Sequence, residues 1–250
     1  MQNPPVAVAN PSHEGRGMSI ASYPDGHLSV WRGRDVLSFI DGLSTNLCLD
    51  LVEGQCKHTT FTTTSAKVID RVMIFHMGGF VACVSHGPHW EALLSHITPR
   101  ILGQDVSITD ATLSNDFYVG FNNDNEYNSS YSSENGVTIG RSIDGFEMIV
   151  ASKGTPIKAD SNWNEFDEWR IAECVPWPGR EITSKHHALA SGLPHDVHPA
   201  KGCYIGQEVL TRMITRGKQG RNLVTVPNNE AKASEVTTRG STHSLVITRL

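Results

Sequence analysis

The chain has 250 residues, and its 21 lysines and arginines nearly balance its 26 aspartates and glutamates, which gives a formal net charge of −5. A chain of this length can bury one sizeable core or two smaller ones. Because proteins that bind nucleic acid carry a broad basic surface, this charge balance indicates that the protein has no direct nucleic-acid partner.

The chain contains five cysteines: Cys48, Cys56, Cys83, Cys174 and Cys203. Their number is odd and no two form a Cys-x-x-Cys pair, which disfavours both a disulfide framework and a structural zinc site. No apolar run approaches the roughly 20 residues needed to cross a bilayer, and the polar N-terminus lacks the charged start and apolar stretch of a signal peptide. We therefore expect a cytoplasmic protein with no membrane partner.

The first expected elements follow a segment that is poor in apolar residues. Residues 1–17 are rich in proline and glycine, which is typical of a flexible arm. Residues 27–31 alternate between apolar and polar side chains, as a strand does. Apolar residues then recur at helical spacing between residues 36 and 47, with Asp35 near the N-terminus of the expected helix.

The middle of the chain has the pattern of an α+β protein. An apolar stripe predicts a second helix over residues 90–101. Segments rich in β-branched and aromatic residues predict strands at 58–63, 68–76, 80–85, 105–109, 117–121, 137–141 and 146–150. The polar run 122–135 is most simply a long solvated loop, and no internal repeat is present.

Residues 201–208, Lys-Gly-Cys-Tyr-Ile-Gly-Gln-Glu, place one thiol inside a turn with a glycine on each side. Gly202 and Gly206 allow backbone conformations that other residues avoid, so we expect Cys203 on a tight, exposed turn. Lys201 supplies a nearby cation, and a helix directly after the turn would point its first amide groups at it. Both effects would favour the thiolate. The alternative is that Cys203 is a small buried hydrophobic residue.

This octapeptide resembles the signature of the YgfZ family, in which an arginine follows a few residues later. The matching residues are Lys201, Gly202, Cys203, Tyr204, Gly206, Gln207 and Glu208, with Arg212 or Arg216 as the arginine. Residues 33–46 and 170–181 resemble two further segments of that family. Its members are folate-binding proteins built like the aminomethyltransferase (T-protein) of the glycine cleavage system. They support iron-sulfur enzymes, including radical enzymes that methylthiolate tRNA.

The resemblance implies a T-protein-like folate-binding fold over residues 18–215 and a reduced β-barrel-like segment over residues 216–250. In that last segment, strands are expected at 223–226, 235–238 and 244–248. The family usually has a complete small barrel here. We therefore expect either a much reduced barrel or an open sheet packed on the main domain.

The resemblance also implies a site for tetrahydrofolate or a derivative. Residues 140–147 resemble the aminomethyltransferase turn whose last glutamate binds the pterin, and a carboxylate can accept from two N–H groups of that ring. The expected folate-binding residues are Glu147, Arg170, Phe166, Asp70 and Asn46. Arg170 would bind the carboxylated tail and Phe166 would stack on an aromatic ring. The alternatives are that Glu147 lies on an exposed hairpin face and that Phe166 belongs to the core.

One position departs from the aminomethyltransferase. In that enzyme, a Gly-Gly-x-x-Asp-Asp segment supplies, at its second aspartate, the carboxylate beside the reacting folate nitrogen. Residues 66–71 of this chain read Ala-Lys-Val-Ile-Asp-Arg. Asp70 matches the first aspartate, whereas Arg71 replaces the second and cannot act as a carboxylate proton acceptor. The sequence therefore disfavours aminomethyl transfer.

Four histidines lie shortly before the octapeptide: His186, His187, His195 and His198. Imidazole groups together with a thiolate could bind iron or zinc. No two of these histidines have the i, i+4 spacing of a helical ligand pair, and glycine and prolines interrupt the segment. We therefore interpret the segment as a polar loop and predict no metal site.

Taken together, the sequence predicts a folate-dependent protein that supports iron-sulfur cluster assembly or repair in client enzymes. Cys203 would act as a nucleophile, a redox thiol or a transient sulfur or iron ligand. The expected partners are folate and iron-sulfur client proteins or assembly factors. Two alternatives stay open: a tetrahydrofolate-dependent aminomethyltransferase or other one-carbon transferase, and a non-catalytic folate-binding scaffold.

Overall fold

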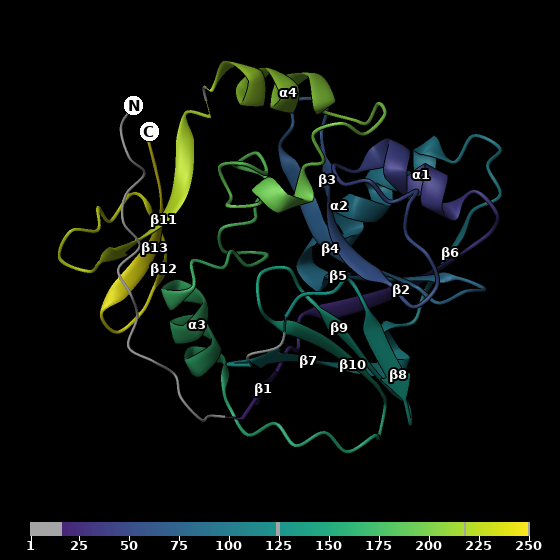
Figure 1. The fold of residues 1–250 in the computed structure, drawn as a ribbon, viewed down its shortest axis with the longest axis horizontal. Helices are drawn as coiled ribbons and strands as arrows, with labels where there is room; N and C mark the ends of the chain where they lie inside the picture. Colours follow the sequence, from purple (N-terminus) through teal and green to yellow (C-terminus); the bar gives the residue numbers. More distant parts are fainter. Residues whose placement is uncertain (1–16, 124–125, 218, 250) are drawn as a thin grey trace.

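The computed structural model describes residues 17–123, 126–217 and 219–249. The predicted flexible arm, residues 1–17, therefore lies outside the described residues except for Gly17. The described chain forms two five-stranded antiparallel sheets, four α-helices and a three-stranded sheet near the C-terminus (Figure 1). None of these helices is long and apolar enough to cross a membrane. The domain boundaries expected from the sequence stay a prediction.

The first five-stranded sheet is covered by two helices. In spatial order its strands are β3 (Cys56–Thr62), β4 (Val68–His76), β5 (Val81–His86), β2 (Gly26–Arg32) and β6 (Ser107–Asp110). The covering helices are α1 (Val36–Leu43) and α2 (Gly87–Ile97), and the 3₁₀ turn η1 (Thr98–Arg100) follows α2. Side chains alternate along β4, so Val72 and Ile74 pack under the helices while Met73 and Phe75 face the second sheet.

The second sheet packs against the uncovered face of the first. Its strands, in spatial order, are β1 (Ser19–Ser22), β7 (Asn115–Phe121), β10 (Glu147–Ser152), β9 (Val137–Arg141) and β8 (Tyr131–Glu134), and the 3₁₀ turn η2 (Thr112–Ser114) precedes β7. Strand β8 lies inside residues 122–135, which were predicted to form a loop, so the predicted loop was too long. Polarity gave no sign of the strand, which pairs with β9 and places the ring of Tyr131 edge-on against Phe75.

Helix α3 (Trp163–Ala172) follows the second sheet and belongs to the same core. It begins with a capping box, in which Asn162 accepts from the amide of Glu165 and the Glu165 side chain accepts from the amide of Asn162. The ring of Phe166 is completely buried and contacts Trp177 edge-on. An aromatic core therefore fixes the face that α3 presents to the sheet.

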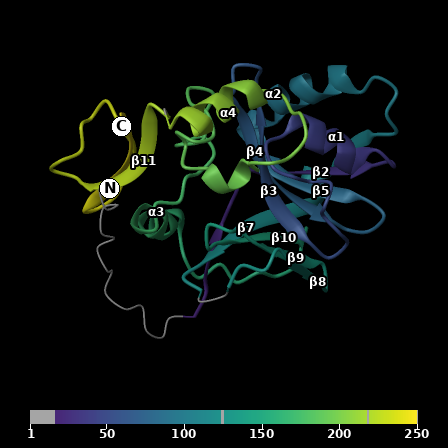
Figure 2. The same ribbon diagram turned by 45° about the horizontal axis from the view of Figure 1, so that its top comes forward.

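Helix α4 (Gln207–Arg216) lies across the end of the β3–β4 hairpin and leads into the C-terminal sheet (Figures 1 and 2). The strands of that sheet, in spatial order, are β11 (Arg221–Pro227), β13 (His243–Arg249) and β12 (Val236–Arg239). Ile171 of α3 packs against its buried face. Of the two expected C-terminal arrangements, the structure has the open sheet.

Candidate functional site

Cys203 lies on the turn that leads into α4, and its side chain is exposed. The turn ends at Gly206, whose φ of 85° belongs to the left-handed region that favours glycine. A Cβ at this position would stand 2.7 Å from both Thr62 Oγ1 and the main-chain oxygen of Thr63. The end of the β3–β4 hairpin therefore approaches the turn so closely that only glycine fits.

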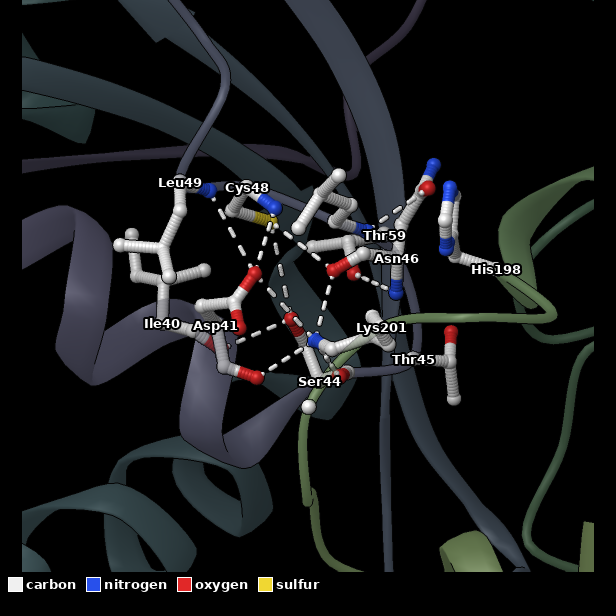
Figure 3. Close-up of polar contacts among 12 residues, drawn as sticks. Ile40, Asp41, Ser44, Thr45, Asn46, Cys48, Leu49, Thr59, His198 and Lys201 are labelled. Atoms are coloured by element: carbon white, nitrogen blue, oxygen red, sulfur yellow. Dashed lines mark hydrogen bonds and ion pairs between the residues drawn. The ribbon is translucent and has the colours of Figure 1, made fainter.

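Lys201 holds the other end of the turn. Its buried Nζ donates to the main-chain oxygens of Asp41 at 2.6 Å, Ser44 at 2.8 Å and Asn46 at 2.8 Å (Figure 3). An ammonium group has three N–H donors, so these bonds use all of them. The sequence predicted that Lys201 keeps Cys203 ionised. The structure shows that the ammonium group anchors the turn, and its effect on the ionisation of Cys203 stays a prediction.

The three carbonyl groups are available to Lys201 because α1 ends there. The last carbonyls of a helix lack intrahelical partners and carry partial negative charge. Ser44 is extended, so the chain leaves the helix and turns under the ammonium group. The carboxylate of Asp41 lies 3.4 Å from Nζ and also accepts from the amide of Cys48. Burial lowers the pKa of Lys201, and the charge of Asp41 acts in the opposite direction.

Asn46, an expected folate ligand, belongs to this anchor. Its side chain donates to the main-chain oxygen of His58 at 2.7 Å, and its amide donates to Thr59 Oγ1 at 3.0 Å (Figure 3). These bonds attach the loop after α1 to strand β3. The role of Asn46 in the described structure is therefore to shape the loop that Lys201 binds.

Cys48 is a second thiol beside the anchor, and the sequence analysis assigned it no role. Its Sγ lies 3.8 Å from Ser44 Oγ and 3.5 Å from the main-chain oxygen of Asn46. Burial raises the pKa of Cys48 to about 11, although the nearby charge of Lys201 lowers it. Cys48 is therefore protonated at neutral pH, and Cys203 is the exposed member of the five cysteines.

The remaining residues of the octapeptide divide between the interior and the surface. Tyr204 is buried, and the ammonium group of Lys201 lies 5.0 Å from the centre of its ring. Gln207 donates to the main-chain oxygen of Gly202 at 3.3 Å and so closes the turn around the thiol. On the surface, Glu208 and Arg212 form an exposed ion pair one helical turn apart, at 2.9 Å. The pattern thus combines a buried anchor with an exposed thiol.

A second polar cluster surrounds Arg71, which replaces the catalytic aspartate of the aminomethyltransferase. Its guanidinium forms a bidentate pair with Asp196, at 2.8 and 3.0 Å, and contacts Asp144 at 2.5 Å. Burial opposes the charge, but the two carboxylates raise the pKa of Arg71 above its ordinary value. Asp196 lies in the 3₁₀ turn η3 (Pro194–Asp196) and Asp144 in the turn before β10. Arg71 therefore joins three distant segments by buried charges and offers no proton acceptor.

Beside Arg71 lies a cavity of about 20 Å³, lined also by Tyr23, His58, His86, Phe146 and Trp177. Such a volume holds about one water molecule, whereas pockets for drug-sized ligands measure about 300–1,000 Å³. Among the described residues, neither ring nitrogen of His58 has a hydrogen-bond partner, and the same holds for the indole nitrogen of Trp177. The cavity beside Arg71 is therefore too small for a pterin ring and does not fit tetrahydrofolate.

Two of the expected folate-binding residues on α3 are part of the core instead. Arg170 is completely buried, pairs with Glu181 at 2.8 Å and Asp167 at 2.5 Å, and donates to Thr238 of β12 at 2.6 Å. The side chain of Phe166 is also completely buried. Neither is therefore accessible to a folate tail or ring. Arg170 is buried against the C-terminal sheet and Phe166 in the aromatic core, and their expected roles in folate binding stay a prediction.

Glu147 and Asp70 also point away from a common ligand site. Phe146 and Met148 line the cavity, and since strand residues alternate between faces, Glu147 lies on the opposite face of β10. Its carboxylate is 3.3 Å from Arg141 Nε. Asp70 is completely buried and accepts from the amide of His86 and from His89 Nδ1. The five expected folate-binding residues do not surround one cavity.

The sequence analysis also missed the histidines at the end of β5 and the start of α2. His86 Nδ1 is 2.8 Å from the hydroxyl of Tyr23, and burial lowers the pKa of His86 to about 4. His89 Nδ1 lies 2.9 Å from the carboxylate of Asp70. Both histidines are far from their partners in the sequence, so no spacing rule indicates these contacts. Of the histidines that precede the octapeptide, none belongs to a group of metal-ligating residues within the described part of the chain.

Comparisons with known proteins identify the fold. No family model matches the chain. A crystal structure of the glycine cleavage system aminomethyltransferase T from Bartonella henselae superimposes with a TM-score of 0.74, over 93% of this chain and 78% of that protein, at 12% sequence identity. The chain has the fold of aminomethyltransferase T. At this identity the likeness concerns the fold alone.

The chain is also similar in sequence to a protein of Arabidopsis thaliana whose name describes a candidate chloroplastic transferase. The two are 25% identical over 219 residues, which is 73% of this chain. The chain spans 50% of the length of that relative. These comparisons show the fold of aminomethyltransferase T and a likeness in sequence to a protein described as a transferase, and they do not test the finer resemblance to the YgfZ family.

Proposed function

We propose that this protein supports iron-sulfur enzymes through the thiol of Cys203, as the resemblance to the YgfZ family implies. The observation that favours this function is the construction of the turn. Cys203 is exposed, while Lys201 and Gly206 on either side of it are fixed to the protein. A backbone held in this way presents the sulfur in one place, as a nucleophile, redox thiol or transient ligand needs. The clients would be iron-sulfur enzymes such as those that methylthiolate tRNA.

The four other thiols are poor candidates for this chemistry. Burial raises the pKa of Cys56 to about 12 and that of Cys48 to about 11, and it also raises the pKa of Cys83 and Cys174. Thiols are weak nucleophiles and weak metal ligands compared with thiolates. Any thiol chemistry at neutral pH is therefore expected at Cys203.

Tetrahydrofolate was expected as the cofactor, and the fold is that of a folate-dependent enzyme. The residues around the central cavity do not fit it, because aromatic and histidine side chains leave room for about one water molecule. We therefore assign no step of the proposed function to folate. Isothermal titration with tetrahydrofolate would test this point directly, and micromolar binding would contradict it.

A one-carbon transferase is the second candidate, because the matched Arabidopsis protein is described as a transferase. It has weaker support in the structure. The expected catalytic carboxylate is replaced by Arg71, and the two nearest carboxylates, Asp144 and Asp196, are occupied by that guanidinium. A transferase of this fold would need an ionised carboxylate free to accept a proton.

The proposed function is tested by rescue of tRNA methylthiolation in a host that lacks its own YgfZ-type protein. The parent chain, Cys203→Ser and the control Cys174→Ser are compared at equal soluble amounts. We expect rescue by the parent and by the control and none by Cys203→Ser. Equal rescue by all three chains would move the function from the thiol to a scaffold role. No rescue by the soluble parent would contradict the proposed client class.

A further inference from the structure

A group of cations gathers where α4 meets the β3–β4 turn and the loop 183–187. We call it the basic tip, defined by the cations Lys67, Lys185 and Arg221 together with the neighbouring His186 and His187. Main-chain pairing holds Lys67 beside the loop 183–187: Lys67 forms a β-bridge with His187, and the amide of Val68 donates to the main-chain oxygen of His186 at 3.0 Å. Arg221 lies close enough to His186 for its charge to act on that histidine. The ammonium group of Lys67 donates to the main-chain oxygen of Lys185 at 2.6 Å. Like charges are therefore held side by side.

No opposite charge balances the basic tip within the described residues. None of the ion pairs among them includes Lys67, Lys185 or Arg221. Burial lowers the pKa of His186, and the neighbouring cations, Lys67 first, lower it further. The formal net charge of the whole chain is −5. A local positive surface on an acidic protein marks a place where a negatively charged partner is attracted and oriented.

The basic tip is continuous with the turn that carries the thiol. Ala66 and Val68, which flank Lys67, belong to the same buried cluster as Tyr204 and Leu210. Helix α4 bridges the two sites: it starts four residues after Cys203 and ends five residues before Arg221 (Figure 1). Ten helical residues span about 15 Å. A partner bound at the basic tip and lying along α4 would therefore reach Cys203.

The outer face of α4 favours a protein as this partner. Ile214 is 47% exposed, whereas Val209 and Met213 are partly exposed and pack against the buried cluster that contains Tyr204 and Leu210. Apolar side chains beside cations are the composition of a protein interface. A protein that binds single-stranded nucleic acid usually offers aromatic side chains for base stacking. No aromatic residue lies on α4, in the β3–β4 turn or in the loop 183–187.

We propose that the basic tip and the outer face of α4 bind an acidic, partly apolar segment of the iron-sulfur client or assembly factor and bring it to Cys203. This inference rests on the proposed function. The surface would steer the partner by long-range attraction, and the apolar side chains of α4 would hold it in contact. Binding is therefore expected to weaken as salt concentration rises.

The first test measures binding without any client enzyme. The probes are a fluorescent peptide rich in glutamate and leucine, its glutamine counterpart, and oligodeoxythymidine of the same formal charge. Fluorescence anisotropy compares the parent with Lys67→Glu/Lys185→Glu and with Lys153→Glu/Lys158→Glu, whose two lysines are exposed on a distant loop. We expect about tenfold weaker binding of the acidic peptide by the first variant only.

Two results would overturn the inference. An equal loss of peptide binding in both double variants would show a general effect of charge. Tighter binding of oligodeoxythymidine than of the peptide would show a surface for nucleic acid. Thermal melting of each variant checks that it is folded. Lys185→Glu alone repeats the comparison with one exposed side chain, so a folding defect in the double variant does not leave the inference untested.

The second test asks whether the basic tip serves the thiol. The acidic peptide carries a 2-pyridyl disulfide at one end; the Cys203 thiolate attacks the peptide sulfur, forms a mixed disulfide and releases 2-thiopyridone, which is followed by absorbance. We expect the parent to react about tenfold faster with this peptide than with its glutamine counterpart, and Lys67→Glu/Lys185→Glu to lose that preference. Equal rates for both peptides would separate the basic tip from Cys203. Rescue of tRNA methylthiolation, measured independently, would still decide the proposed function.

Discussion

Lys201 and Asp41 are 160 residues apart in the sequence, yet Lys201 Nζ donates to the main-chain oxygen of Asp41 at 2.6 Å. The same ammonium group binds two further carbonyls of the loop after α1 (Figure 3). The lysine of the octapeptide thus caps the C-terminal end of a distant helix. It acts as a positioning residue for the turn that carries Cys203.

Lys201→Met is therefore expected to destabilise the protein by about 3 kcal/mol, because three buried carbonyl groups lose their donor. Urea unfolding measures this change. Iodoacetamide labelling of Cys203 in the folded variant should also change in rate, since the turn loses one of its two attachments. Lys232→Met, at an exposed position, is the control. Unchanged stability together with unchanged labelling would contradict the role of Lys201 as the anchor.

The second attachment of the turn is Gly206. Gly206→Ala introduces a Cβ that meets Thr62 and Thr63 at 2.7 Å and also forces a side chain into the left-handed region. Gly217→Ala, at φ 58° with no atom within 4 Å of the added Cβ, introduces the strain without the clash. We expect the free energy of unfolding to fall by about 3 kcal/mol for Gly206→Ala and by about 1 kcal/mol for Gly217→Ala. Equal losses by thermal unfolding would show that the close approach has no effect.

Arg71 is expected to be structural in this protein. Arg71→Met leaves the carboxylates of Asp144 and Asp196 without a counter-charge. The free energy of unfolding should therefore fall by about 3–5 kcal/mol. Arg34→Met removes an exposed guanidinium, 3.0 Å from Asp105, and should leave the free energy of unfolding almost unchanged. Urea unfolding of both variants gives the comparison. A small loss for Arg71→Met would mean that the two carboxylates are solvated, and would reopen the transferase alternative.

Local patterns predicted most elements of the fold. The expected helix at 36–47 is α1, which ends at Leu43 because Ser44 turns into extended backbone to meet Lys201. The glycine-bracketed turn was also predicted, because it depends on residues next to one another, and the helix considered after it is α4. Strand β8 was missed because its four residues, Tyr-Ser-Ser-Glu, are mostly polar and pair only at the edge of the sheet.

The candidate site was less predictable, because tertiary contacts decide which way a side chain points. Lys201 is close to Cys203 in sequence, but its charge is used by a distant helix end. Arg170 matches a motif position, but Glu181 and Thr238 surround it in the interior. Because side chains alternate between the two faces of β10, Glu147 lies on the face away from the cavity. Motif spacing identifies such residues without giving their partners.

The central cavity gives the last prediction, which concerns pH. Burial, and to a smaller extent the charge of Arg71, lowers the pKa of His58 from its ordinary value of 6.5 to about 3. Between these two pKa values the unfolded chain binds a proton at His58 that the folded chain does not. The stabilising effect of neutral His58 is therefore complete above pH 6.5 and is lost as the pH falls toward 3, at up to about 1.4 kcal/mol per pH unit.

His58→Phe removes this titration and keeps an aromatic ring, which in the parent lies 5.7 Å from the ring of Phe146. The free energy of unfolding should therefore fall less steeply for this variant than for the parent between about pH 6 and about pH 4. His243→Phe, at an exposed position, should keep the slope of the parent. Equal slopes for the parent and for His58→Phe would mean that His58 is protonated in the folded protein, and that the cavity beside Arg71 admits enough solvent to stabilise the charge.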